Sequence, residues 1–118
     1  MLQFESLQNE LREFAKERDW EQFHSPKNLA MALAVEVSEL MEIFQWVSEE
    51  DSKTLPSDVV ESAAQEIADV QIYLARIADV LGVDIGEAVE AKLQVNKSKY
   101  PAERVRGSSK KYTSYDSE

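Results

Sequence analysis

Apolar residues recur at helical spacing in four long segments of the chain, and no segment alternates between apolar and polar residues as a strand would. The first segment runs from about Phe4 to Arg18. The second begins at Ser25 and Pro26, a typical helix start, and continues to about Trp46. This periodicity predicts an all-α protein.

The third segment runs from an expected N-cap at Ser57 to about Leu81. Gly82 then provides a C-cap glycine. Asp84 opens the fourth segment with a capping box, and Pro101 ends it. The sequence between the second and third segments, SEEDSKTLPSD, is predicted to be an acidic loop.

Residues 102–118 contain Gly, Ser, Lys and Tyr without a helical period. We expect residues 1–101 to form one helical domain and 102–118 to be a basic tail, either flexible or ordered by a ligand or a neighbouring subunit. The third segment also has apolar residues on more than one face, which a single small bundle would leave exposed. Assembly into a homodimer or homotetramer is the simplest remedy.

Two acidic pairs interrupt two of the apolar faces. Glu36 and Glu39 lie three residues apart in the second segment, and Glu66 and Asp69 do so in the third. Buried carboxylates are costly unless they are paired or bound to a metal, and four of them facing one interior would repel one another. If the two helices pack antiparallel, both pairs can converge on the same ions. The pattern predicts a site for Mg²⁺, or alternatively Mn²⁺, whereas the competing interpretation is ordinary surface charge.

Charge and composition narrow the classes of function. The net charge is −10, although seven basic residues and one acidic residue lie between positions 92 and 111. An acidic body argues against a nucleic-acid polymer as partner, while the local basic stretch suits a phosphorylated small molecule. There is no cysteine, so disulfides and thiolate chemistry are excluded. The polar N-terminus and the lack of a long apolar run predict no membrane segment and a cytoplasmic location.

Three segments carry a resemblance to a known family: ERDWEQFHSPKNLAMALAVEVSELMEIFQW, EIADVQIYL and KSKYP. They resemble the all-α nucleoside triphosphate pyrophosphohydrolases called MazG-like, over about residues 4 to 113. WEQFH, FQW and the terminal SSKKYT favour the dCTP-pyrophosphatase-like branch. The resemblance implies a four-helix-bundle-like fold, assembled as a dimer or a dimer-of-dimers tetramer.

The same resemblance implies hydrolysis of a nucleoside triphosphate between the α and β phosphates, yielding the monophosphate and pyrophosphate. The first expected substrate is dCTP or a modified dCTP, removed to cleanse the nucleotide pool. By match of motif, the four carboxylates would be Mg²⁺ ligands and catalytic groups, and Glu39 is our choice for the general base. The expected contacts to base, sugar and other parts of the substrate are Trp20, Glu21, Gln22, Phe23, His24, Trp46 and Tyr73.

Other residues could act on the pyrophosphate or shape the base pocket. Asn96, Lys97, Lys99 and Tyr100 in the fourth segment could reach the leaving group. Trp20, Phe23 and Trp46 could form an aromatic box for the base, although each could equally be plain core. His24, the single histidine, could bond the base or sugar, or could simply pack beside Ser25.

One position departs from the resemblance, and two interpretations compete with it. Animal members of the family have a substrate-contacting histidine where this chain has Leu11, which leaves the base preference open and admits dUTP or a broad substrate range. The interpretation from a different class is a non-catalytic acidic helical module, used for oligomerisation or regulation, that binds divalent metal.

Overall fold

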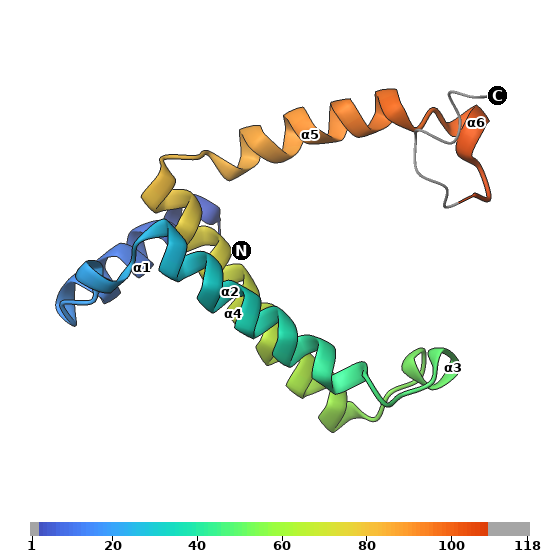
Figure 1. Cartoon of the computed structure of the whole chain (residues 1–118), viewed down its shortest axis with the longest axis horizontal. Coiled ribbons are helices and arrows are strands. Elements are labelled where there is room, and N and C mark those ends of the chain that lie inside the picture. Colours follow the sequence, from blue (N-terminus) through green and yellow to red (C-terminus); the bar gives the residue numbers. More distant parts are fainter. Residues whose placement is uncertain (1–2, 109–118) are drawn as a thin grey trace. The chain divides into compact units, whose positions relative to one another are not determined.

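The computed structural model describes residues 3–108, and every regular element in this range is helical (Figure 1). The predicted all-α class is therefore confirmed. The chain divides into two compact units, Met1–Val83 and Asp84–Glu118, which are described separately. The first contains α1 (Phe4–Glu17), η1 (Glu21–Phe23), α2 (Pro26–Phe44), α3 (Glu49–Ser52) and α4 (Ser57–Leu81), and the second contains α5 (Ile85–Lys99) and α6 (Ala102–Val105).

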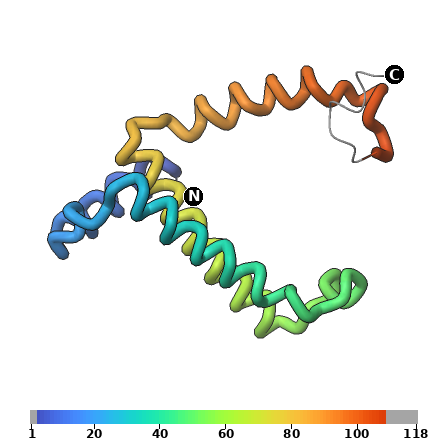
Figure 2. The backbone as a smooth tube through the Cα atoms, in the orientation of Figure 1, coloured from blue at the N-terminus to red at the C-terminus, as the bar shows by residue number. Residues whose placement is uncertain are grey.

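The first unit is built around a long antiparallel hairpin of α2 and α4, with α1 packed against α4 (Figure 2). Side-chain bonds reinforce the contact between α1 and α4. Arg12 donates to both carboxylate oxygens of Asp79, at 3.1 and 2.6 Å, and Gln8 donates to the carbonyl oxygen of Ala75 at 3.2 Å. These bonds fix the position of α1 along α4.

The predicted starts of two helices are confirmed in atomic detail. The Ser25 hydroxyl accepts a hydrogen bond from the backbone N–H of Asn28 at 3.1 Å and begins α2. The Asp84 carboxylate does the same for Glu87 at 2.9 Å and begins α5. Each cap satisfies a backbone donor that the first turn would otherwise leave without a partner.

Two helices end in the same Schellman geometry, of which the sequence revealed only one. Gly82 closes α4 with a φ of 70°, as predicted, and Val83 N–H bonds the carbonyl of Ala78. At the end of α1, Asp19 takes the left-handed position with a φ of 56°, and Trp20 N–H bonds the carbonyl of Ala15. Aspartate tolerates this conformation better than most residues, so the chain reverses there without glycine.

The boundaries of α2 and α4 need correction. α2 ends at Phe44, two residues before the expected end at about Trp46. Pro56, and not Ser57, occupies the N-cap of α4, and Ser57 is the first helical residue. Proline fixes an extended conformation at the N-cap but has no side-chain acceptor, so the helix begins without a side-chain cap.

Three single-turn elements lie where no helix was predicted. α3 forms inside the predicted acidic loop because the Ser48 hydroxyl caps the N–H of Asp51 and acidic residues occupy its first turn. η1 forms between α1 and α2, and α6 forms in the first residues of the predicted tail. Such short turns carry too few residues for a hydrophobic period to be visible.

The buried interior of the described residues consists mostly of small side chains. The fully or nearly buried apolar residues are Ala15, Leu29, Ala63, Ala75 and Ala78. Large apolar side chains on α2 and α4 instead remain exposed, among them Met31, Val35, Met41, Val60 and Ile67. Exposed apolar surface of this extent is typical of interaction surfaces. Among the described residues, no helix is both long and apolar enough to cross a lipid bilayer.

Candidate functional site

Three carboxylates converge where α2 and α4 run antiparallel. Glu36 and Glu39 come from α2 and Glu66 comes from α4, and one oxygen of each lies within 4.8 Å of the others. The predicted meeting of the two acidic pairs therefore occurs for these three residues. Carboxylate oxygens gathered so closely are the donor set that hard divalent cations prefer.

Two oxygens of this cluster are buried without a partner. Within residues 3–108, neither Oε2 of Glu36 nor Oε2 of Glu66 receives a hydrogen bond. Burial, followed by interaction with Glu39, raises the pKa of Glu36 to about 7. Burial also raises the pKa of Glu66, with Glu39 and Asp69 contributing. A divalent cation would supply the missing partner and remove the repulsion, so the residues present fit Mg²⁺.

Asp69 stands slightly apart from the other three. It lies on α4 three residues after Glu66 and is half-buried, but none of its oxygens joins the group that converges within 4.8 Å. Its negative charge nevertheless contributes to the raised pKa values of Glu36 and Glu66. Asp69 is therefore at the edge of the cluster, and its role as a ligand stays a prediction.

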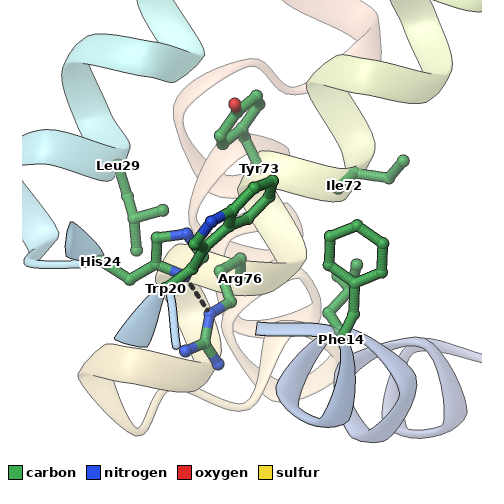
Figure 3. A pocket seen from close by; sticks show the side chains of 8 residues that line it. Phe14, Trp20, His24, Leu29, Ile72, Tyr73 and Arg76 are labelled. Atoms are coloured by element: carbon green, nitrogen blue, oxygen red, sulfur yellow. Dashed lines mark hydrogen bonds between the residues drawn. The ribbon is translucent and has the colours of Figure 1, made fainter. Parts of the chain in front are cut away.

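An apolar pocket of about 100 Å³ opens beyond the cluster, toward the α1 end of the hairpin. Four elements build it (Figure 3), and its lining residues are Leu11, Phe14, Trp20, His24, Leu29, Ile72, Tyr73 and Arg76. The rings of Phe14 and Trp20 meet edge to face with centroids 5.6 Å apart, and the Arg18 guanidinium lies 3.6 Å above the Phe14 ring. The resulting aromatic wall suits a flat ligand.

A polar network supports one side of the pocket. Arg76 donates from Nε to Nδ1 of His24 at 3.0 Å (Figure 3). The same guanidinium bonds Asp79 Oδ2 at 3.3 Å, and Asp79 also accepts both bonds from Arg12. The bond from Arg12 is the main cause of the lowered pKa of Asp79, so this carboxylate is ionised and holds both cations.

The cluster and the pocket share one face of α4. Seven residues separate Glu66 from Tyr73, so the two side chains lie on the same face about 10 Å apart along the axis. Glu36 and Leu29 have the same separation on α2, which runs the opposite way. The carboxylates and the aromatic pocket thus lie on the same face of the hairpin, about two helical turns apart.

Several residues predicted to contact substrate do not line this pocket. Phe23 is 59% exposed, and Trp46, in the turn after α2, is 90% exposed, so the expected aromatic box does not form within the described part of the chain. Gln22 bonds back to Asp19, and Glu21 is exposed. Their contacts to substrate stay predictions.

The predicted pyrophosphate contacts Asn96, Lys97, Lys99 and Tyr100 all belong to the second unit, on or directly after α5. They lie at the C-terminal end of that helix, where Lys97 and Lys99 make the last turn basic. Their approach to the carboxylates stays a prediction.

The sequence analysis missed Arg76 and the pocket walls formed by Phe14 and Ile72. Arg76 is only 8% exposed, although arginine is rarely buried without partners. One signal was available: Arg76 is the only basic residue in α4, and Asp79 follows it by three positions. A lone cation of this kind within an apolar stripe indicates a buried polar network. Leu11, noted for its departure from animal relatives, does line the pocket.

The chain is similar to known proteins in both sequence and fold. The chain is 48% identical to dCTP pyrophosphatase 1 from Homo sapiens and 47% identical to the Bos taurus protein of that name, in each case over 103 residues, which are 86% of this chain and 61% of the relative. The chain therefore spans about three fifths of the length of these curated relatives.

A solved structure of a pyrophosphatase from Archaeoglobus fulgidus is similar with a TM-score of 0.75 and 42% sequence identity. The match covers 86% of this chain and 94% of that one. The pattern of the MazG-like family matches residues 31–114, which include all four carboxylates. The chain belongs to the MazG-like family.

Proposed function

We propose that this protein is a Mg²⁺-dependent nucleoside triphosphate pyrophosphohydrolase that cleaves dCTP or a modified dCTP to the monophosphate and pyrophosphate. One observation carries the proposal. Glu66 of the carboxylate cluster and Tyr73 of the aromatic pocket lie on one face of α4, about 10 Å apart along the helix axis, a spacing that suits a nucleotide whose base and phosphates are separated by a sugar. The 48% identity to dCTP pyrophosphatase 1 supports the same substrate class.

The pocket favours a base with a single ring. Apolar cavities of roughly 150 Å³ hold a benzene-sized molecule, and this pocket of about 100 Å³ is of the same order. The Trp20 and Tyr73 rings offer aromatic surface against which a flat pyrimidine can stack. A bicyclic purine would have to displace part of the wall that Phe14 and Ile72 form.

Glu36, Glu39 and Glu66, with Asp69 beside them, would hold Mg²⁺. When bound, the ion supplies positive charge that neutralises phosphate oxygens and makes a water molecule a better nucleophile. Mn²⁺ has the same preference for oxygen ligands and should substitute.

The chain's own groups would direct the bond cleavage. Glu39 is the exposed member of the cluster, so it can accept the proton of the attacking water. The water oxygen forms a bond to the α-phosphorus, and the bond from that phosphorus to the oxygen bridging toward the β-phosphorus breaks. Pyrophosphate leaves, and the basic side chains of α5, Lys97 and Lys99, are proposed to bind it.

A homo-oligomer, either a dimer or a tetramer, is part of the proposal. Met31, Val35 and Met41 expose apolar surface on α2, and Val60 and Ile67 do so on α4. Covering these side chains with another copy of the chain would remove their apolar surface from water. The highly exposed Trp46 could then complete the site of a neighbouring copy.

The direct test incubates the purified protein with Mg²⁺ and a panel of dCTP, 5-methyl-dCTP, dUTP and dATP. Phosphorus NMR should show monophosphate and pyrophosphate, with the pyrimidines cleaved faster than dATP. Hydrolysis in ¹⁸O-water should place the label in the monophosphate, because attack is at the α-phosphorus.

Two outcomes would contradict the proposal. Release of inorganic phosphate with a diphosphate product would show cleavage at another bond. No cleavage of any triphosphate, combined with Mg²⁺ binding by calorimetry, would instead identify a non-catalytic metal-binding module.

A further inference from the structure

Arg76 is the one charged side chain that is buried among residues 3–108, and it contacts the pocket. Its Nε donates to Nδ1 of His24 at 3.0 Å, and a second guanidinium nitrogen bonds Asp79 at 3.3 Å. His24 lies 52 positions earlier in the chain, directly after η1. This long-range contact joins a loop residue of the pocket to the most buried part of α4.

The contact determines where the proton of His24 sits. Arginine stays protonated in proteins and has no hydrogen-bond acceptor, so Nδ1 must receive the bond through its lone pair. A neutral imidazole with a lone pair on Nδ1 carries its proton on Nε2. An imidazolium would place an N–H of His24 directly against an N–H of Arg76, which the geometry disfavours.

Electrostatics favour the same neutral ring. Burial, and then the positive charge of Arg76, lower the pKa of His24 below its ordinary value, against a smaller opposite effect of Glu21. Arg76 and Glu21 are the charged groups that act on the ring. His24 is therefore neutral at pH 7, and the bond from Arg76 decides between its two tautomers.

Arg76 is itself held in place by an ion pair with Asp79. Asp79, one turn further along α4, accepts from Arg76 and also takes two bonds from Arg12 of α1. A guanidinium with one nitrogen fixed by Asp79 has little freedom to rotate away from His24. Nδ1 is thus occupied, and Nε2 is the ring nitrogen left for a ligand.

We propose that Arg76 is a positioning residue of the base pocket, which keeps His24 as an Nε2–H donor so that the imidazole gives one hydrogen bond to an acceptor atom of a pyrimidine base. The proposal rests on the proposed nucleotide substrate. Cytosine and uracil share an acceptor of this kind in the O2 carbonyl, so the donor can bond either base without choosing between the two.

The chain contains a single histidine, so the tautomer can be observed directly. Long-range ¹H–¹⁵N NMR on untagged, ¹⁵N-labelled protein near pH 7.5 yields one pair of imidazole nitrogens. The wild type should show Nε2 protonated and Nδ1 unprotonated. In Arg76→Met, the two ¹⁵N chemical shifts should move toward the values of a mixture of tautomers. Arg76→Lys keeps a donor and a charge, so it should partly restore the wild-type values.

Arg12→Met is the matched control because it leaves Asp79 bound to Arg76, and its His24 pattern should equal that of the wild type. Circular dichroism verifies that each variant is folded. If Arg76→Met does not fold, the wild type and Arg76→Lys still decide the question. A wild-type ring protonated on Nδ1, or an unchanged pattern in folded Arg76→Met, would overturn the proposal.

Kinetics and ligand binding test the role in recognition. In Arg76→Met, KM for dCTP should rise about tenfold, the scale expected when one hydrogen bond is lost, while kcat changes less than about threefold. Adding dCMP to the wild type should change the ¹⁵N chemical shift of His24 Nε2. If dCMP shifts this nitrogen but dCTP is not hydrolysed, only the proposed function fails. An unchanged KM in a variant with altered tautomers would overturn the positioning role alone.

Discussion

The carboxylate cluster and the aromatic pocket are neighbours on α4, yet they are built in opposite ways. The cluster comes from two helices and places like charges together, so that two buried oxygens lack partners among the described residues. The pocket draws on α1, the η1 segment, α2 and α4, and its buried cation bonds both His24 and Asp79. The cluster is therefore incomplete without a ligand, whereas the pocket is already formed before a ligand binds.

A substitution in the cluster should have the largest effect on activity. Glu66→Gln keeps the size of the side chain but removes one charged ligand oxygen, so kcat should fall at least about a hundredfold. Helicity should not change, because the substitution keeps the size of the side chain and removes a charge that repels its neighbours. Steady-state pyrophosphate release measures the effect.

The matched control for that variant is Glu61→Gln, which removes an exposed charge from the same helix. It should retain activity close to that of the wild type. Full activity in Glu66→Gln would mean that the carboxylates are not the catalytic centre.

The pocket should respond through KM more than through kcat. Trp20→Ala removes an aromatic wall, and since stacking is worth ~1–3 kcal/mol per base, KM for dCTP should rise on the order of tenfold or more. Phe23→Ala is the comparison, because Phe23 is close in sequence but does not line the pocket. Equal effects of the two changes would show that the pocket described here does not hold the base.

The raised pKa of Glu36 makes the stability of the metal-free fold depend on pH. Because the folded-state pKa is about 7 and the ordinary value is 4.5, the metal-free fold binds the proton more tightly than the unfolded chain does. The free energy of unfolding should therefore fall as pH rises from about 4.5 through about 7. Glu36→Gln removes this loss, so in EDTA its Tm should exceed that of the wild type near pH 8, with little difference near pH 4.5.

Two controls accompany this measurement by thermal circular dichroism. Glu42→Gln, on an exposed position of α2, should show no such pH-dependent difference. Mg²⁺ should raise the Tm of the wild type near pH 8 and have less effect on Glu36→Gln. A wild type that is more stable than Glu36→Gln in EDTA near pH 8 would contradict the raised pKa.

The smallest expected effect concerns the capped start of α2, at the pocket end of the hairpin. Ser25→Ala removes the acceptor for Asn28 N–H and should lower the free energy of unfolding by about 1 kcal/mol. Ser38→Ala, in the middle of α2, should have almost no effect, since its hydroxyl bonds only a carbonyl that is already used. Urea titration with a tryptophan fluorescence readout gives both values.

The cluster was predictable because it follows from one rule, the spacing of side chains on a helix. Periodicity was enough to place Glu36, Glu39 and Glu66 on facing stripes of two helices. Residue type at the helix ends was enough to locate the helix boundaries at Ser25, Gly82 and Asp84. No tertiary information was needed beyond the antiparallel pairing of two helices.

The pocket was only partly predictable because its residues are brought together by the reversal after α1. Trp20, His24 and Tyr73 were named as substrate contacts, but Phe23 and Trp46 were expected beside them and do not line the pocket. The direction of each side chain depends on the left-handed turn at Asp19, which no hydrophobic pattern reveals.

The buried position of Arg76 was also not predictable from local sequence. The sequence shows a lone arginine in an apolar stripe, but its partner His24 is 52 positions away, and local spacing cannot indicate such a pair. Only the packing of α1 and η1 onto α4 explains why the charge is tolerated there.

The alanines that line the interior have a consequence for how this sequence can vary over evolutionary time. Ala63, Ala75 and Ala78 let α4 approach its neighbours closely, and a larger side chain at any of them would push the helices apart and separate the oxygens that must meet. We expect lineages descended from a common ancestor to keep these three positions small while the walls around the base diversify. New substrate preferences could then arise without disturbing the spacing on which the chemistry depends.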